Sequence, residues 1–146
     1  MKKTVLSLGL LVAASVVSAD NMRPEGSVEY RQSAFRLMEF QLNFLNPMHR
    51  SQAYSEEAFA YRADMLSRLG ALAHEGFTEE SCSADSRASS RICDNREDFD
   101  QRMLDFIEIT ANMAEASKAG NNRQTRDLFR QTLQSCRSCH DQYRLD

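Results

Sequence analysis

A five-residue motif near the C-terminus, Cys136-Arg137-Ser138-Cys139-His140, constrains the chain more than any other feature of the sequence. On a helix, positions 136, 139 and 140 stand at i, i+3 and i+4 and therefore share one face. Two thiols at this spacing can add across the two vinyl groups of a haem, and the adjacent imidazole can then reach the iron. The motif predicts one covalently bound haem c, held by Cys136 and Cys139, with His140 as an axial iron ligand.

The same cysteines and histidine could instead form a zinc site or a redox-active dithiol. A zinc site built from Cys136, Cys139 and His140 needs a fourth ligand, which Cys82 or Cys93 could supply. A thioredoxin-like dithiol requires the motif near a βαβ pattern, and the sequence shows no strand-like alternation. The adjacent histidine and an N-terminal export signal favour haem over both alternatives.

Residues 1–19 have the pattern of a cleaved secretory signal peptide. Two lysines give a charged start, an apolar run extends over Val5–Val17, and small residues precede a cleavage site after Ala19. The run is shorter than the ~20 residues that a membrane-spanning helix needs. We therefore expect a mature protein, residues 20–146, located in the bacterial periplasm.

Length and charge limit the function classes. The chain of 146 residues has a formal net charge of −3, and loss of the two lysines with the signal peptide makes the mature chain more acidic. Residues 20–146 suffice for one domain with one core. An acidic chain without basic runs gives no reason to expect nucleic acid or a membrane surface as a partner.

The mature chain contains four segments with helical periodicity. The first is predicted to run from Pro24, which suits a first helical turn, to Asn46, where Pro47 should stop it. The second should begin at Ser55 as an N-cap and continue to about Ala73. Each carries one apolar stripe at three- and four-residue steps, which predicts one buried face per helix.

The third and fourth helices follow a long connection. Asp94 and Glu97 have capping-box spacing at the start of the third helix, and Gly120 should end it. Asn121 and Asn122 can cap the fourth helix, which leads into the haem motif. Four amphipathic helices with one long crossover predict an all-α fold, an antiparallel four-helix bundle with its cofactor between facing helices.

The crossover, residues 76–95, contains the other two cysteines. In an oxidising compartment Cys82 and Cys93 are free to pair with each other if Cys136 and Cys139 hold haem. Closing a loop of this length is worth roughly 3 kcal/mol in the chain-entropy description. We expect a disulfide that staples the crossover, with free thiols or an intermolecular bridge as the alternatives.

Two blocks of sequence carry a family resemblance. The first is residues 30–38, Tyr-Arg-Gln-Ser-Ala-Phe-Arg-Leu-Met, and the second is residues 136–144, Cys-Arg-Ser-Cys-His-Asp-Gln-Tyr-Arg, preceded by Phe129. Together they resemble the cytochrome c′ family of class II c-type cytochromes, whose haem motif lies near the C-terminus. The resemblance spans essentially all of the mature chain, although the Cys82/Cys93 pair is not expected of the family.

The resemblance implies roles for individual residues. His140 would be the only protein ligand of a five-coordinate, high-spin iron, and Phe35 would cover the opposite haem face. Arg31 and Gln32 match residues near the haem propionates, and Arg144 matches a basic residue beside the proximal imidazole. With the two thiols, these side chains form the expected haem site.

Alternatives stay open for several positions. Helical periodicity would also accept Phe35 as an ordinary core residue, and Arg31, like most arginines, could be solvated. Met38 lies one turn from Phe35 and could supply a second axial bond, which would give a six-coordinate, low-spin electron carrier, although it also fits plain core packing. His49 and His74 are expected to be solvated or to cap helix ends.

Two functional classes follow from the resemblance, and neither is an enzyme. One is electron transfer with transient redox partner proteins. The other is binding of small diatomic gases, NO more readily than CO, because a phenylalanine over the iron cannot coordinate it but could yield to a small ligand. The family's common homodimer would use the first two helices, with Phe40, Phe44, Phe59 and Tyr61 as the candidate apolar patch.

Overall fold

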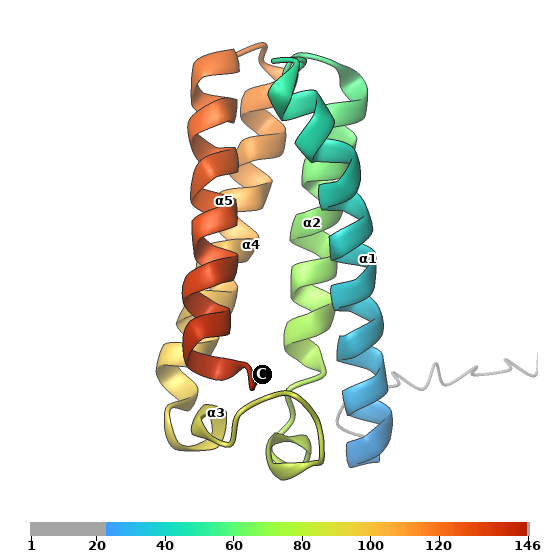
Figure 1. Ribbon diagram of the computed structural model, residues 1–146, viewed down its shortest axis with the longest axis vertical. Coiled ribbons are helices and arrows are strands. Elements are labelled where there is room, and N and C mark those ends of the chain that lie inside the picture. The colour runs from blue at the N-terminus through green and yellow to red at the C-terminus, as the bar shows by residue number, and fades with distance from the viewer. Residues whose placement is uncertain (1–22, 146) are drawn as a thin grey trace, which may run out of the picture.

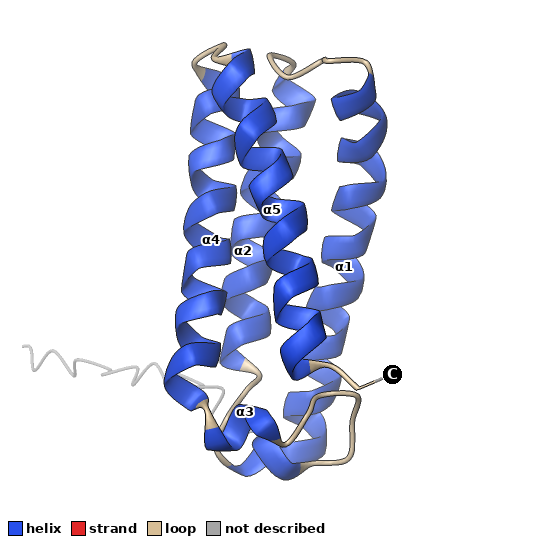
Figure 2. Cartoon of the chain, turned by 60° about the vertical axis from the view of Figure 1, so that its left-hand side comes forward, coloured by secondary structure: helices blue, strands red, loops and turns tan. Residues whose placement is uncertain are grey.

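The computed structural model describes residues 23–145, whose regular structure is helical. Four long helices form a bundle in which each runs antiparallel to the next along the chain: α1 (Pro24–Arg50), α2 (Glu57–Glu75), α4 (Arg96–Lys118) and α5 (Asn122–Tyr143) (Figure 1, Figure 2). The crossover between α2 and α4 holds the short helices η2 (Glu80–Ser83) and α3 (Arg91–Asp94). The predicted four-helix bundle is confirmed, whereas the predicted signal peptide lies outside the described residues. None of the described helices has the length and apolar composition needed to cross a bilayer.

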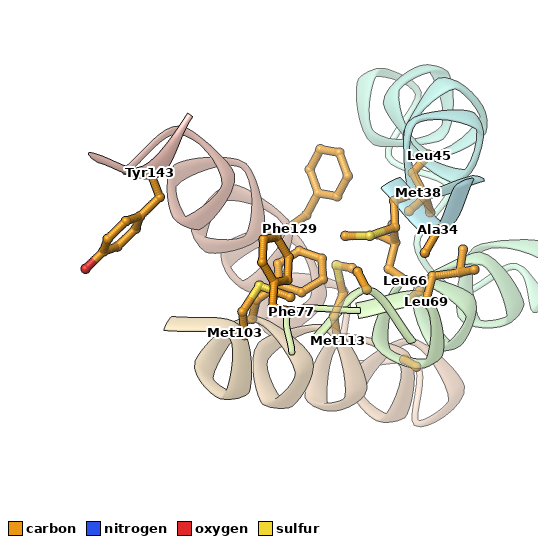
Figure 3. Close-up of a cluster of buried hydrophobic side chains, with 14 of the residues drawn as sticks. Ala34, Met38, Leu45, Leu66, Leu69, Phe77, Met103, Met113, Phe129 and Tyr143 are labelled. Carbon is orange, nitrogen blue, oxygen red and sulfur yellow. The ribbon is translucent and has the colours of Figure 1, made fainter. Parts of the chain in front are cut away.

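The helices pack in the order α1 on α2, α2 on α4 and α4 on α5, and α1 makes no comparable contact with α5. The core is built from the apolar stripes predicted from the sequence, with Phe59, Leu66, Met113 and Phe129 fully buried. Figure 3 shows Met38 and Leu66, from α1 and α2, facing side chains of α4 and α5. Burying each large apolar side chain contributes about 1.5–3 kcal/mol, so this core holds the bundle together.

Pro47 does not end α1, contrary to the prediction, because the helix continues for one more turn to Arg50. A proline in the last turn removes only one hydrogen bond of the helix, and the Pro47 carbonyl still accepts from the Ser51 N–H at 3.0 Å. The extra turn brings the ring of His49 onto that of Phe129 in α5, with ring centroids 4.5 Å apart. Packing between helices therefore outweighs the bond that the proline removes.

Two predicted helix starts are wrong for a related reason. Ser55 is not an N-cap, because α2 begins at Glu57, and Asp94 ends α3 instead of opening a capping box for α4. The starts of α2 and α4 carry no side-chain cap bond. Tertiary packing sets these boundaries where local cap signals are weak.

The predicted junction between α4 and α5 is confirmed. Gly120 adopts a positive φ of 68°, a conformation that costs glycine little. The N–H groups of Gly120 and Asn121 donate to the carbonyls of Ser117 and Ala116, which is the Schellman pattern that ends helices. Asn121 then caps α5 by accepting from the Gln124 N–H at 3.2 Å.

The crossover is closed by the predicted disulfide between Cys82 and Cys93, whose Cα atoms are 5.7 Å apart. Cys82 lies in η2 and Cys93 lies in α3. The bond therefore joins the two short helices of the crossover, and the alternatives of free thiols and an intermolecular bridge are wrong.

His49, expected to be solvated or to cap a helix end, lies in the last turn of α1 and is half-buried. Its Nδ1 lies 2.9 Å from the Tyr54 hydroxyl, and its ring stacks on Phe129. Burial lowers the pKa of His49, and the positive charges of Arg130 and Arg126 lower this pKa further. The folded protein therefore favours the neutral imidazole.

This pKa shift predicts an acid-sensitive contact between α1 and α5. Because the pKa of His49 is lower in the folded than in the unfolded state, its contribution to stability is present above the ordinary histidine pKa of about 6.5 and is lost as the pH falls below it. We expect the free energy of unfolding, measured with urea, to decrease between pH 7.5 and pH 5.5, and to decrease less in His49→Gln. An equal decrease in both proteins would contradict this role of His49.

Candidate haem site

A cavity of about 630 Å³ lies between α1, α4, α5 and the crossover. Its volume is within the range of about 300–1,000 Å³ that is typical of cofactor pockets. Much of its wall is apolar and comes from Phe35, Leu42, Phe77, Phe99, Met103 and Phe106. Its polar wall includes Arg31, Arg36, Arg87, Arg102 and Arg144. Apolar walls with several cations suit a flat, apolar ring that carries carboxylates, as haem does.

The haem motif lines this cavity from the C-terminal part of α5. Cys136 and Cys139 are half-buried free thiols, and His140 joins them in the wall. Burial raises the pKa of Cys136 to about 11, with a contribution from Cys139. Burial also raises the pKa of Cys139. The structure therefore brings together the three side chains that the motif predicts on one helix face.

The structure argues against the two other uses of these residues. Cys82 and Cys93 are bonded to each other, so neither can complete a zinc site. Residues 23–145 contain no group of three or more His, Cys, Asp or Glu side chains that could hold a metal ion. A redox dithiol needs an accessible thiolate, whereas the raised pKa of Cys136 keeps its thiol protonated at neutral pH. Haem attachment is the use that fits these residues.

His140 lies at the exposed edge of the cavity. Partial burial and the positive charges of Arg144 and Arg87 lower the pKa of its imidazole, while the negative charge of Asp141 opposes the shift. The neutral imidazole is the form that coordinates metals. The surroundings of His140 therefore favour the form that an axial ligand needs.

Four predicted residues of α1 line the same cavity: Arg31, Gln32, Phe35 and Met38. Phe35 is half-buried and meets the ring of Phe77 edge-on, with ring centroids 6.3 Å apart. Met38 is buried in the core, with 8% of its surface exposed, and also reaches the cavity wall. Both candidates for a role near the iron, Phe35 and Met38, are therefore in the wall.

Arg31 is almost fully buried, with 2% of its surface exposed, so the solvated alternative is wrong. Its Nη1 donates to the Gly76 carbonyl and the Ser81 hydroxyl, both at 2.9 Å, and its Nη2 donates to the Ser86 hydroxyl at 3.2 Å. Burial lowers the pKa of Arg31, but arginine stays protonated in proteins. Arg31 lines the cavity, and its donors fasten the crossover to α1.

The end of α5 is attached to both the crossover and α4. The Ser89 N–H donates to the Tyr143 carbonyl at 2.9 Å, and Arg144 forms an isolated antiparallel bridge with Ala88. The Tyr143 hydroxyl donates to Asp98 at 2.6 Å. A hydrogen bond from Arg102, followed by that from Tyr143, lowers the pKa of Asp98. These contacts position Arg144 in the cavity wall with His140.

His74, expected to be solvated or a helix cap, instead pairs with α4. Its Nε2 lies 2.7 Å from Asp100, and Arg96 donates to both oxygens of Asp100 and to the Phe77 carbonyl. Burial raises the pKa of Asp100, but the hydrogen bonds from Arg96 and His74 outweigh it and lower the pKa overall. This network holds the start of the crossover, and with it the cavity residue Phe77.

Sequence reasoning missed several residues of the cavity wall. Phe99, Met103 and Phe106 belong to the apolar stripe of α4, and periodicity cannot distinguish a core position from a cavity position. Arg87 lies in a crossover without a sequence pattern, so nothing in the sequence pointed to it. Arg102 had one signal, since Asp98 precedes it at the i, i+4 spacing of a helical ion pair.

Comparison with known proteins gives consistent matches. Residues 26–144 match the sequence profile of a family described as Cytochrome C′. A cytochrome c′ of Halomonas halodenitrificans is 32% identical over 132 residues, covering 84% of this chain and 98% of that protein. The solved cytochrome c prime from Shewanella frigidimarina is 31% identical with a TM-score of 0.75, covering 85% of this chain and 98% of its own. A nitric oxide complex of a cytochrome c prime variant from Alcaligenes xylosoxidans is 29% identical with a TM-score of 0.76, with the same coverage.

The buried position of Arg31 predicts a large effect on stability. Arg31→Ala removes the buried guanidinium that donates to the Gly76 carbonyl and to the Ser81 and Ser86 hydroxyls, and we expect a loss of about 3 kcal/mol in the free energy of unfolding. The matched control is Arg50→Ala, an exposed arginine in the last turn of the same helix that does not line the cavity, which should cost less than about 1 kcal/mol. Urea unfolding measures both, and equal losses would contradict the buried clamp.

Proposed function

Because the chain belongs to the cytochrome c′ family, we propose that it is a periplasmic c-type haem protein that transfers electrons, binds small gases such as NO, or does both. The observation that carries the proposal is the single cavity wall shared by Cys136, Cys139 and His140 of α5 and by Phe35 of α1. Residues 1–19 would direct export as a cleaved signal peptide, so the mature protein would begin at Asp20. No catalytic role is proposed.

Each of these wall residues would have a different role in binding a haem. Cys136 and Cys139 would form the two thioether links, and the neutral imidazole of His140 would bind the iron. A c-type haem supplies an iron that changes oxidation state and accepts a small ligand. Arg31 and Gln32 lie in the wall where the resemblance implies propionate contacts. Because Arg31 already donates to the crossover, its remaining role towards a carboxylate is mainly that of a nearby buried charge.

With Phe35 over the other haem face, as the resemblance implies, the iron would be left open and five-coordinate. An aromatic ring cannot coordinate a metal, and its apolar surface excludes water from the space that it covers. Phe35 also contacts Phe77 of the crossover, so a ligand that enters on this side has to displace a packed side chain. Such a site discriminates in favour of ligands that bind iron strongly enough to offset that displacement, which suits NO better than CO.

Met38 supports a second candidate, a six-coordinate electron carrier. Its side chain lies in the cavity wall, and thioether ligation raises the reduction potential of a haem. Optical and EPR spectra of the ferric and ferrous protein, with and without NO, distinguish the two candidates. We expect a high-spin spectrum that Met38→Leu leaves unchanged. A low-spin spectrum that becomes high-spin in Met38→Leu would contradict the open site.

The role of Phe35 predicts a change in ligand-binding rate. Phe35→Ala removes the side chain that has to be displaced, so we expect CO to bind the ferrous protein at least tenfold faster, as measured by stopped flow. Leu104→Ala is the control, because Leu104 is 50% exposed on α4 and is absent from the cavity wall. An unchanged rate in Phe35→Ala would remove Phe35 from its proposed position over the iron.

We also propose a homodimer through α1 and α2. Leu37, Phe40 and Phe44 of α1 and Tyr61 of α2 expose between 49% and 59% of their surfaces, and apolar side chains gathered on neighbouring helices are typical of interaction sites. Phe59, expected in this patch, is fully buried against Tyr54 and Phe129 and cannot contribute.

The dimer proposal predicts that charge on this face separates the subunits. Phe40→Glu places a carboxylate in the patch, and we expect sedimentation velocity to show a monomer where the unaltered haem-loaded protein shows a dimer. Leu104→Glu is the matched control on another helix and should leave the dimer intact. A monomer in the unaltered protein at all concentrations tested would contradict the proposal.

A further inference from the structure

His140 lies in a part of α5 where helices tend to fray. His140 lies three residues before the end of α5, in the last turn of the last helix. Terminal helical turns fray because their carbonyls lack partners further along the helix. An axial ligand, however, has to hold its ring at a fixed distance and angle. The end of α5 therefore needs a support from outside the helix.

The crossover supplies that support through Arg87. The Leu145 N–H donates to the Arg87 carbonyl at 2.8 Å, and the Arg87 Nη2 donates to the Leu145 carbonyl at 3.3 Å. Arg87 therefore binds both backbone polar groups of Leu145, the N–H and the carbonyl. The neighbouring bond from Ser89 to Tyr143 completes a short antiparallel pairing around Arg144. In Figure 1 the C-terminus lies close to the crossover at the lower end of the bundle.

The crossover can act as a support because it is itself fixed. The Cys82–Cys93 disulfide closes it on both sides of Arg87. The Ser86 hydroxyl accepts from Arg31 Nη2 and from the Ala88 N–H, both at 3.2 Å. The residues on either side of Arg87 are therefore tied to a buried side chain of α1.

Arg87 also brings a charge to the part of the cavity wall that holds His140. Arg87, Arg144 and His140 line the same cavity, and the charges of both arginines act on His140. A positive charge near a haem iron favours the ferrous over the ferric state, because the ferric state carries one more positive charge. Arg87 would therefore act on a haem iron through its charge as well as through its hydrogen bonds to Leu145.

From these contacts we propose that Arg87, presented by the disulfide-closed crossover, is a positioning residue for the axial imidazole of His140. This inference rests on the proposed haem ligation by His140. It assigns to the crossover a role at the iron and gives the Cys82–Cys93 bond a function beyond stability.

The test compares Arg87→Gln and Arg87→Lys with the unaltered haem-loaded protein. Two readouts are used, the midpoint reduction potential and the iron–imidazole stretching band of the ferrous protein in resonance Raman spectra. We expect Arg87→Gln to lower the potential and to broaden or shift the band, and Arg87→Lys to restore most of the potential because it keeps the charge. Arg91→Gln, an exposed arginine of the same crossover that does not line the cavity, should change neither readout.

A Cys82→Ala/Cys93→Ala protein tests the part played by the disulfide. Measured well below its unfolding temperature, it should show the same broadening or shift of the iron–imidazole band as Arg87→Gln. A normal band in the unaltered protein that both Arg87→Gln and the double variant leave unchanged would overturn this inference alone, whatever the change in potential. An unaltered protein that carries haem but shows no iron–imidazole band would overturn the proposed His140 ligation as well.

Discussion

The proposed haem site depends on one geometric requirement, that two thiols and an imidazole share one face within the last turns of α5. That face has to meet a cavity, and the helix end that carries it has to be immobile. Phe129 anchors α5 in the core at one end, and the buried Tyr143 anchors it at the other. The disulfide-closed crossover then holds the residues that follow. The cavity, the haem motif and the disulfide-closed crossover, which a plain four-helix bundle lacks, all lie towards the end of the bundle where α5 ends.

The cavity itself follows from how the helices pair. Contacts run from α1 to α2, from α2 to α4 and from α4 to α5, which leaves α1 and α5 free to line a shared space. Near the other end, His49 and Phe129 bring α1 and α5 into contact, so the space is confined to one part of the bundle. The cavity therefore lies between helices whose spacing is set by core packing in another part of the bundle. This arrangement is typical of cofactor sites in helix bundles.

Much of this could be predicted from the sequence, and the errors have physical causes. Helical periodicity predicted the four helices, and the Gly120–Asn121 junction was predicted because its signal is local. The helix end predicted from Pro47 and the helix start predicted at Ser55 were wrong, because packing between helices overrides local stop and start signals. Arg31 was expected at the surface or near propionates, and its burial depends on carbonyl and hydroxyl acceptors at Gly76, Ser81 and Ser86, which no pattern reveals. Arg87 could not be predicted, because only the fold brings the crossover to the end of α5.

The central claim is that Cys136 and Cys139 hold one haem covalently, with His140 on its iron. Intact-mass spectrometry of the mature protein, produced together with a cytochrome c maturation system, tests this claim most directly. The account predicts a red protein whose mass equals that of the chain from Asp20 plus one haem, and loss of that added mass in Cys136→Ala/Cys139→Ala. A colourless protein with the mass of the bare chain would contradict it.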